Sequence, residues 1–111
     1  MHTEDSLETV QQKLAAGQAV LVDVREKDEW DAGHVAGAVF LPLSELSRDN
    51  GTVAALAAEQ LPNEKIIYTH CHLGIRSVSA AEILKSLGYD VRPLQPGYDD
   101  LIAAGFEKAD K

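Results

Sequence analysis

Residues 65–87 read KIIYTHCHLGIRSVSAAEILKSL, and this stretch decides the fold. Its first part, 65–70, has the β-branched and aromatic composition of a strand. Residues 76–87 have one apolar face at the i, i+3, i+4, i+7 spacing of a helix, made of Ala80, Ile83, Leu84 and Leu87. A loop, 71–75, joins the two. The chain is therefore expected to run from the end of a strand through a short loop into a helix.

The alternation of strand and helix continues on both sides of this stretch. Further strands are predicted at 19–24, 38–41 and 90–94, helices at 5–16, 52–60 and 97–104, single helical turns at 28–32 and 43–47, and a loop at 48–51. The segments 19–24 and 38–41 are apolar enough for buried strands. Asp5 is a candidate helix cap, and Pro93 places the last strand near a sheet edge. Such alternation predicts an α/β fold, a small parallel β-sheet flanked by helices on both faces.

Length and composition indicate one globular domain covering 1–111, with 45% hydrophobic and 25% charged residues. With 10 basic and 18 acidic side chains the formal net charge is -8, which argues against binding to nucleic acid or to anionic membranes. No apolar run approaches the roughly 20 residues of a membrane helix. No secretory signal is visible, and a lone cysteine fits a reducing compartment. We therefore expect a cytoplasmic monomer.

The loop places a cysteine where chemistry is favoured. Cys71 lies between a strand end and a helix N-terminus, where backbone N–H groups are unpaired and the helix dipole is positive. A loop there can direct several N–H groups at an anion, so a thiolate is favoured and would be a useful nucleophile. Gly74 allows the positive φ of a tight loop. The alternative to a nucleophile is a buried structural cysteine that is chemically inert.

The charges around Cys71 differ from those of the whole chain. His70, His72 and Arg76 lie close together in the sequence, and no carboxylate occurs from 68 to 81. This cluster predicts a small electropositive pocket for an anionic substrate. His70, Cys71 and His72 could also be read as metal ligands, but a fourth ligand is missing. We expect neither a metal nor a cofactor.

Three segments together resemble the rhodanese-like sulfurtransferase family. They are Val22-Asp23-Val24-Arg25-Glu26, then Glu29-Trp30-Asp31-Ala32-Gly33-His34-Val35-Ala36-Gly37-Ala38, and the loop Cys71-His72-Leu73-Gly74-Ile75-Arg76-Ser77. The order and spacing match over essentially the whole chain. Ala36 replaces the family's usual proline. Gln95-Pro96-Gly97-Tyr98 stands where the family often has Gly-Gly followed by a nearby tryptophan.

The resemblance implies a rhodanese-like fold and a Cys71 that accepts a sulfane sulfur as a persulfide. The donor would be a small sulfur-containing anion, thiosulfate or a persulfide, and the acceptor would be cyanide, a thiol or a protein thiol. The substrate would be bound by the loop residues His72, Leu73, Gly74, Ile75 and Arg76. Asp23, Arg25 and His34 are candidate supporting residues. For these three, structural pairing and turn formation are the alternative.

Two other functions stay open at this point. The chain could be a persulfide carrier or a protein-interaction module in a sulfur relay. A cysteine-dependent phosphatase or arsenate reductase is the weaker alternative, because Cys71 and Arg76 are separated by four residues where related phosphatases have five. The shorter loop suits a single sulfur better than a phosphate.

Overall fold

The computed structural model describes residues 2–48 and 50–110, and its centre is a parallel sheet. Within these residues the sheet has four strands in the order β2-β1-β3-β4. They are β1 (Ala19–Asp23), β2 (Val39–Phe40), β3 (Ile66–His70) and β4 (Asp90–Pro93). Every neighbouring pair is parallel, and Asp23 is in register with His70 at the carboxyl ends of β1 and β3. The predicted α/β fold with a parallel sheet is confirmed.

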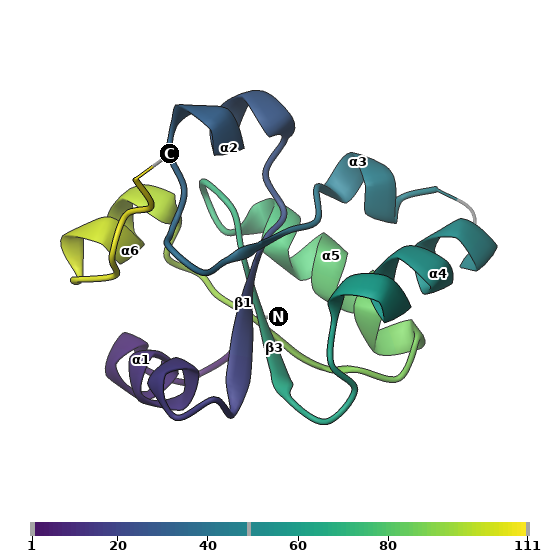
Figure 1. Ribbon diagram of the computed structural model, residues 1–111, viewed down its shortest axis with the longest axis horizontal. Helices are drawn as coiled ribbons and strands as arrows, with labels where there is room; N and C mark the ends of the chain where they lie inside the picture. The colour runs from purple at the N-terminus through teal and green to yellow at the C-terminus, as the bar shows by residue number, and fades with distance from the viewer. Residues whose placement is uncertain (1, 49, 111) are drawn as a thin grey trace.

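Helices cover both faces of the sheet (Figure 1). On one face lie α1 (Leu7–Ala15) and α6 (Tyr98–Ala103); on the other lie α3 (Leu43–Leu46), α4 (Asn50–Gln60) and α5 (Ile75–Ser86). Each face has its own hydrophobic core. Buried side chains of the first core include Val10, Tyr68 and Leu101, and those of the second include Val53, Ile67 and Leu84. The sheet is thus sandwiched between two apolar layers.

The helix α2 (Lys27–Ala32) lies over the end of the sheet where β1 and β3 finish (Figure 1). The predicted turn at 28–32 is confirmed as this short helix. Glu26 and Glu29 close its first turn, because the backbone N–H of Glu26 donates to Glu29 Oε1 at 3.0 Å. The helix thus lies above the carboxyl ends of the strands, where ligands bind in open α/β sheets.

Both edge strands are short. The edge position predicted for 90–94 from Pro93 is confirmed, since β4 pairs only with β3 in the described sheet. The buried strand predicted at 38–41 is wrong in extent and burial, because β2 holds only Val39 and Phe40 and both are half-buried. As the other edge of the described sheet, β2 pairs with β1 only, and the Trp30 ring packs against Phe40 with ring centroids 4.9 Å apart.

The first helix, predicted at 5–16, begins two residues later, at Leu7. Ser6 is its N-cap, with Oγ accepting from the backbone N–H of Thr9 at 3.1 Å. Asp5 instead accepts from Tyr68 Oη at 2.6 Å and from Arg92 Nη1 at 2.9 Å. Asp5 is therefore not the helix cap but a tie between the N-terminal segment and the sheet.

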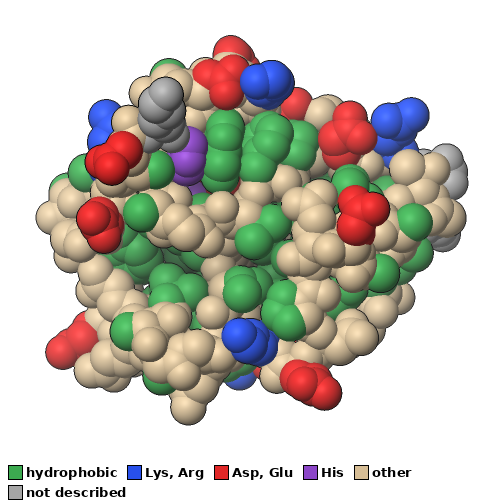
Figure 2. All heavy atoms as spheres, in the orientation of Figure 1, with side chains coloured by type: hydrophobic (Ala, Val, Ile, Leu, Met, Phe, Trp, Pro, Cys, Tyr) green, Lys and Arg blue, Asp and Glu red, His purple; other side chains and the backbone are tan. Residues whose placement is uncertain are grey.

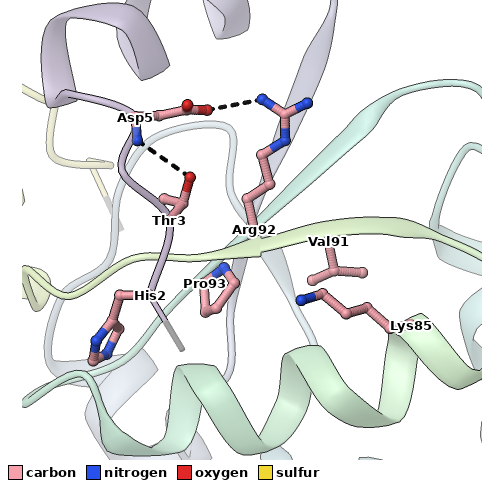
Figure 3. Close-up of a pocket in the computed structure, with 7 residues that line it drawn as sticks. All are labelled: His2, Thr3, Asp5, Lys85, Val91, Arg92 and Pro93. Atoms are coloured by element: carbon pink, nitrogen blue, oxygen red, sulfur yellow. Dashed lines mark hydrogen bonds and ion pairs between the residues drawn. The ribbon is translucent and has the colours of Figure 1, made fainter.

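The N-terminal segment crosses the chain at the carboxyl end of β4, beside Pro93 (Figure 3). The N–H of Thr3 donates to the carbonyl of Pro93 at 2.7 Å. A hollow of about 410 Å³ lies here, lined by His2, Thr3, Asp5, Lys85, Val91, Arg92 and Pro93. The bond from Thr3 gives one backbone carbonyl of the edge strand a partner.

Two further segments differ from or add to the sequence-based expectation. The loop predicted at 48–51 is shorter, because α4 already begins at Asn50; Asp49 lies outside the described residues. After α6 the chain returns to the turn following α2, where Ala36 N donates to Glu107 O and Ala109 N to His34 O, both at 2.8 Å. None of the helices in the described residues combines the length and the apolar character needed to cross a membrane.

Candidate active site

Cys71 directly follows β3 and precedes the N-terminus of α5. Its side chain is almost fully buried, with 1% of the residue exposed, and Sγ accepts from the backbone N–H of Gly74 at 3.1 Å. A hollow of about 230 Å³ opens beside it, lined by Cys71, His72, Leu73, Ile75 and Arg76. The loop thus brings the predicted binding residues together around one sulfur, held by an N–H donor at a helix start.

The conformation of this loop depends on Gly74. Its φ of +85° is in the left-handed region, and a Cβ there would lie 2.7 Å from the carbonyl oxygen of Gln95. The Gly74 carbonyl lies 2.9 Å from Ser77 Oγ and 2.7 Å from His2 Nε2. The positive φ expected at Gly74 is confirmed. Ser77 and His2 thus support the loop, a role that was not predicted from the sequence.

Gly97 supports the same loop from a second segment. A Cβ on Gly97 would lie 1.7 Å from the carbonyl oxygen of His72, so no side chain fits there. The neighbouring Tyr98 N–H donates to the carbonyl of Cys71 at 2.9 Å. The segment 95–98, seen in the sequence only as a departure from the family pattern, therefore packs directly against the cysteine loop.

Arg76 is paired with a carboxylate. Its Nη1 and Nη2 donate to Glu29 Oε1 and Oε2 at 2.6 and 2.9 Å. This bidentate contact is the largest cause that lowers the pKa of Glu29 to about 2. The electropositive pocket predicted from the absence of nearby carboxylates is therefore wrong, because α2 brings one from 47 positions away. Sequence proximity does not reveal such tertiary pairing.

His70 does not add positive charge to the site. The side chain is fully buried beside Asp23, with 3.7 Å between His70 Nε2 and Asp23 Oδ2. Neither ring nitrogen has a hydrogen-bond partner among the described residues. Burial lowers the pKa of His70 to about 4, so the ring is neutral near pH 7. The contribution of His70 to the predicted electropositive pocket is therefore wrong. His72 is exposed and lines the hollow beside Cys71.

Asp23 and Arg25 form a buried ion pair at the carboxyl end of β1. Arg25 Nη2 donates to Asp23 Oδ2 at 2.8 Å and to the carbonyl of Gly33 at 2.7 Å. The guanidinium also lies 4.3 Å from the centroid of the Tyr98 ring. This geometry favours the structural interpretation of both residues. The pair links the end of β1 to the turn after α2 and to the start of α6.

His34 and Trp30 form a packed unit in that turn. Their rings stack with centroids 3.6 Å apart, and His34 Nδ1 lies 3.0 Å from the carbonyl oxygen of Trp30. The contacts match a turn-fixing role for His34 and a packing role for Trp30. Within the part of the chain that the structure describes, no three His, Cys, Asp or Glu side chains gather in a way that could hold a metal ion.

Comparison with known proteins gives one family over nearly the whole chain. The model of the rhodanese-like domain matches residues 6–104. The chain is 34% identical over 99 residues to the putative sulfur carrier protein YrkF of Bacillus subtilis, a match covering 87% of this chain and 49% of the relative. It is also 34% identical over 91 residues to human thiosulfate:glutathione sulfurtransferase, covering 76% and 78% of the two chains. It thus spans about half of the bacterial relative.

Solved structures agree with the family match. The human single-domain sulfurtransferase TSTD1 superimposes with a TM-score of 0.73 at 30% identity, covering 89% of this chain and 94% of that one. A rhodanese-related protein from Thermoplasma volcanium gives 0.74 at 24% identity and 95% coverage of each chain, a likeness of fold alone.

Proposed function

The chain belongs to the rhodanese-like domain family, and we propose that it is a sulfurtransferase that works through a persulfide on Cys71. In the first step the Cys71 thiolate attacks the outer sulfur of a donor. The S–S bond of the donor breaks, and the rest of the donor leaves with the electron pair. In the second step an acceptor attacks the same sulfur, and the Cys71 thiolate leaves.

The position of Sγ carries this proposal. Sγ lies at the start of α5, accepts from the Gly74 N–H at 3.1 Å and borders a hollow of about 230 Å³. A thiolate and a persulfide anion both gain from such a donor and from the helix dipole. Because the thiolate is the nucleophile, the transfer requires no separate general base.

The remaining roles follow from the same geometry. The substrate would be bound in the hollow beside Cys71, by the other lining residues His72, Leu73, Ile75 and Arg76. Gly74 would give the loop its shape through its positive φ. Asp23 and Arg25 would support the loop through His70 and Tyr98, and His34 would fix the turn after α2. Thiosulfate or a persulfide is the proposed donor, and a thiol, cyanide or a protein thiol is the proposed acceptor.

Intact-protein mass spectrometry tests the proposal. Incubation with thiosulfate or with a low-molecular-weight persulfide should add one sulfur atom, and a thiol or cyanide should remove it. Cys71 is the sole cysteine in the sequence, so Cys71→Ser should abolish the gain completely. Loading of the Cys71→Ser variant, or no loading of the wild type by either donor, would overturn the proposal.

A sulfur carrier in a relay is the second candidate, and one observation favours it. Leu73 and Ile75 are each 72% exposed at the rim of the Cys71 hollow, where a protein surface could cover them. A carrier would load a persulfide but release it slowly to small acceptors. Rapid turnover with cyanide or a dithiol would count against this function and for the enzyme.

A further inference from the structure

The Arg76 guanidinium, the one permanently charged group among the described residues lining the Cys71 hollow, is already occupied by Glu29. We propose that Glu29 sets the donor specificity, by holding Arg76 in a neutral pair that disfavours dianionic thiosulfate and leaves the site to neutral hydropersulfides of organic thiols, R–S–SH. This inference rests on the proposed sulfur transfer through Cys71. Glu29 is a positioning residue in this scheme, because it acts through Arg76.

The pair between Arg76 and Glu29 is held by several hydrogen bonds. Both terminal nitrogens of the guanidinium donate to Glu29, at 2.6 and 2.9 Å, and the side chains of Arg76 and Glu29 are 31% and 30% exposed. Glu29 is also fixed from its own helix, since Oε1 accepts from the Glu26 N–H at 3.0 Å. In Figure 1, α2 lies over the sheet end from which the loop enters α5. A bidentate, half-shielded pair of this kind is stronger than an exposed one.

The two donors place different charges in the hollow. With thiosulfate, a thiolate meets a dianion: the outer sulfur bonds to Sγ, the S–S bond breaks, and sulfite leaves with the electron pair. Three negative charges then gather beside Cys71, and a free cation would be needed to offset them. With R–S–SH, the thiolate attacks a neutral molecule, R–S⁻ leaves, and the proton stays on the transferred sulfur. One negative charge is present throughout.

The rim of the hollow favours the same donor class. Leu73 and Ile75 are each 72% exposed beside Cys71, so the entrance offers apolar contact. An organic group R can bury apolar surface there, whereas a sulfonate oxygen cannot. Apolar contact at the rim and a neutralised cation inside therefore both select an organic hydropersulfide.

The test compares kcat/KM for thiosulfate with kcat/KM for the hydropersulfide of a small uncharged thiol, at one pH, with the same acceptor. Glu29→Gln removes the charge but keeps an oxygen for the Glu26 N–H. It should raise kcat/KM for thiosulfate about tenfold, the effect of one freed charged partner, and leave the hydropersulfide value unchanged. The double variant Glu29→Gln/Arg76→Gln should lose this gain.

Asp31→Asn is the matched control. Asp31 is on the same helix and pairs with Lys27 at 2.9 Å in solvent, so this variant removes one negative charge without touching Arg76. The ratio of the two kcat/KM values should stay at the wild-type level. An equal ratio in wild type and Glu29→Gln, a wild type that prefers thiosulfate, or the same shift in Asp31→Asn would overturn the inference. If neither donor loads the wild type or any variant with sulfur, the proposed sulfur transfer through Cys71 is overturned, and the inference with it.

Discussion

At the scale of single residues, the Asp23–Arg25 pair carries the largest expected cost of substitution. Both side chains are buried, with 2.8 Å between Arg25 Nη2 and Asp23 Oδ2. Asp23→Asn leaves the guanidinium buried without a counter-charge, which should lower the free energy of unfolding by about 3–5 kcal/mol. Urea unfolding followed by circular dichroism measures this loss.

The exposed pair between Lys27 and Asp31 is the reference for that experiment. Its side chains are 77% and 56% exposed, so solvent screens the charges. Asp31→Asn should change the free energy of unfolding by no more than about 1 kcal/mol. Equal losses in the Asp23 and Asp31 variants would show that burial of the first pair has no energetic consequence.

Some residues of the site could be predicted from the sequence, and others could not. The loop from Cys71 to Arg76 is contiguous, so its residues and its left-handed glycine could be predicted from the order of a strand, a glycine and a helix. Glu29 could not be assigned to Arg76, because 47 positions separate them and only the placement of α2 joins them. The neutral state of His70 likewise depends on tertiary burial.

At the scale of elements, the site depends on a contact between two loops. The carbonyl of His72 lies where a Cβ on Gly97 would be, at 1.7 Å. Gly97→Ala must therefore push the segment 95–98 away from the cysteine loop. We expect a loss of about 1–3 kcal/mol in unfolding free energy, as for overpacking, and at least tenfold slower sulfur loading of Cys71 in timed intact-mass measurements.

Gly37→Ala separates this effect from backbone strain. Gly37 has a φ of +81°, but a Cβ there would meet no atom within 4 Å. The variant should lower stability by roughly 1 kcal/mol through strain alone and load sulfur at the wild-type rate. Normal loading of Gly97→Ala would mean that the two loops move independently.

Element order was the most predictable property, and element edges were the least. Alternating apolar segments were enough to predict the strands and helices, because burial on a parallel sheet demands them. The cap of α1 is Ser6 and not Asp5, since Tyr68 and Arg92 engage the Asp5 carboxylate. The half-buried state of β2 follows from its edge position, which hydrophobicity alone does not reveal.

At the scale of the whole molecule, most charged side chains lie on the surface, and buried polar side chains lie at one end of the sheet. Figure 2 shows acidic and basic side chains distributed over one face, with hydrophobic ones between them. The buried polar groups gather instead at the carboxyl ends of β1 and β3, where Asp23, Arg25 and His70 lie next to the cysteine loop. Stability and the site are therefore linked through the same end of the sheet.

His70 makes this link measurable as a pH dependence of folding. Burial lowers the pKa of its ring to about 4 from an ordinary value of 6.5; the nearby Asp23 carboxylate opposes the shift and Arg25 adds to it. Between pH 6.5 and about pH 4, His70 is therefore protonated in the unfolded chain and neutral in the folded chain. The stability is fully present above pH 6.5 and falls as the pH drops toward 4, by about 3 kcal/mol in all.

The Glu29 carboxylate affects the stability only at lower pH than His70 does. Pairing with Arg76 lowers the pKa of Glu29 to about 2 from 4.5, so its contribution is lost only below about pH 4.5. Urea unfolding between pH 7.5 and 4.5 should therefore report mainly on His70. His70→Gln should be less stable overall, because it buries an amide, yet its stability should vary much less with pH. A wild-type slope that survives in His70→Gln would mean that the buried ring is not the group that destabilises the fold in mild acid.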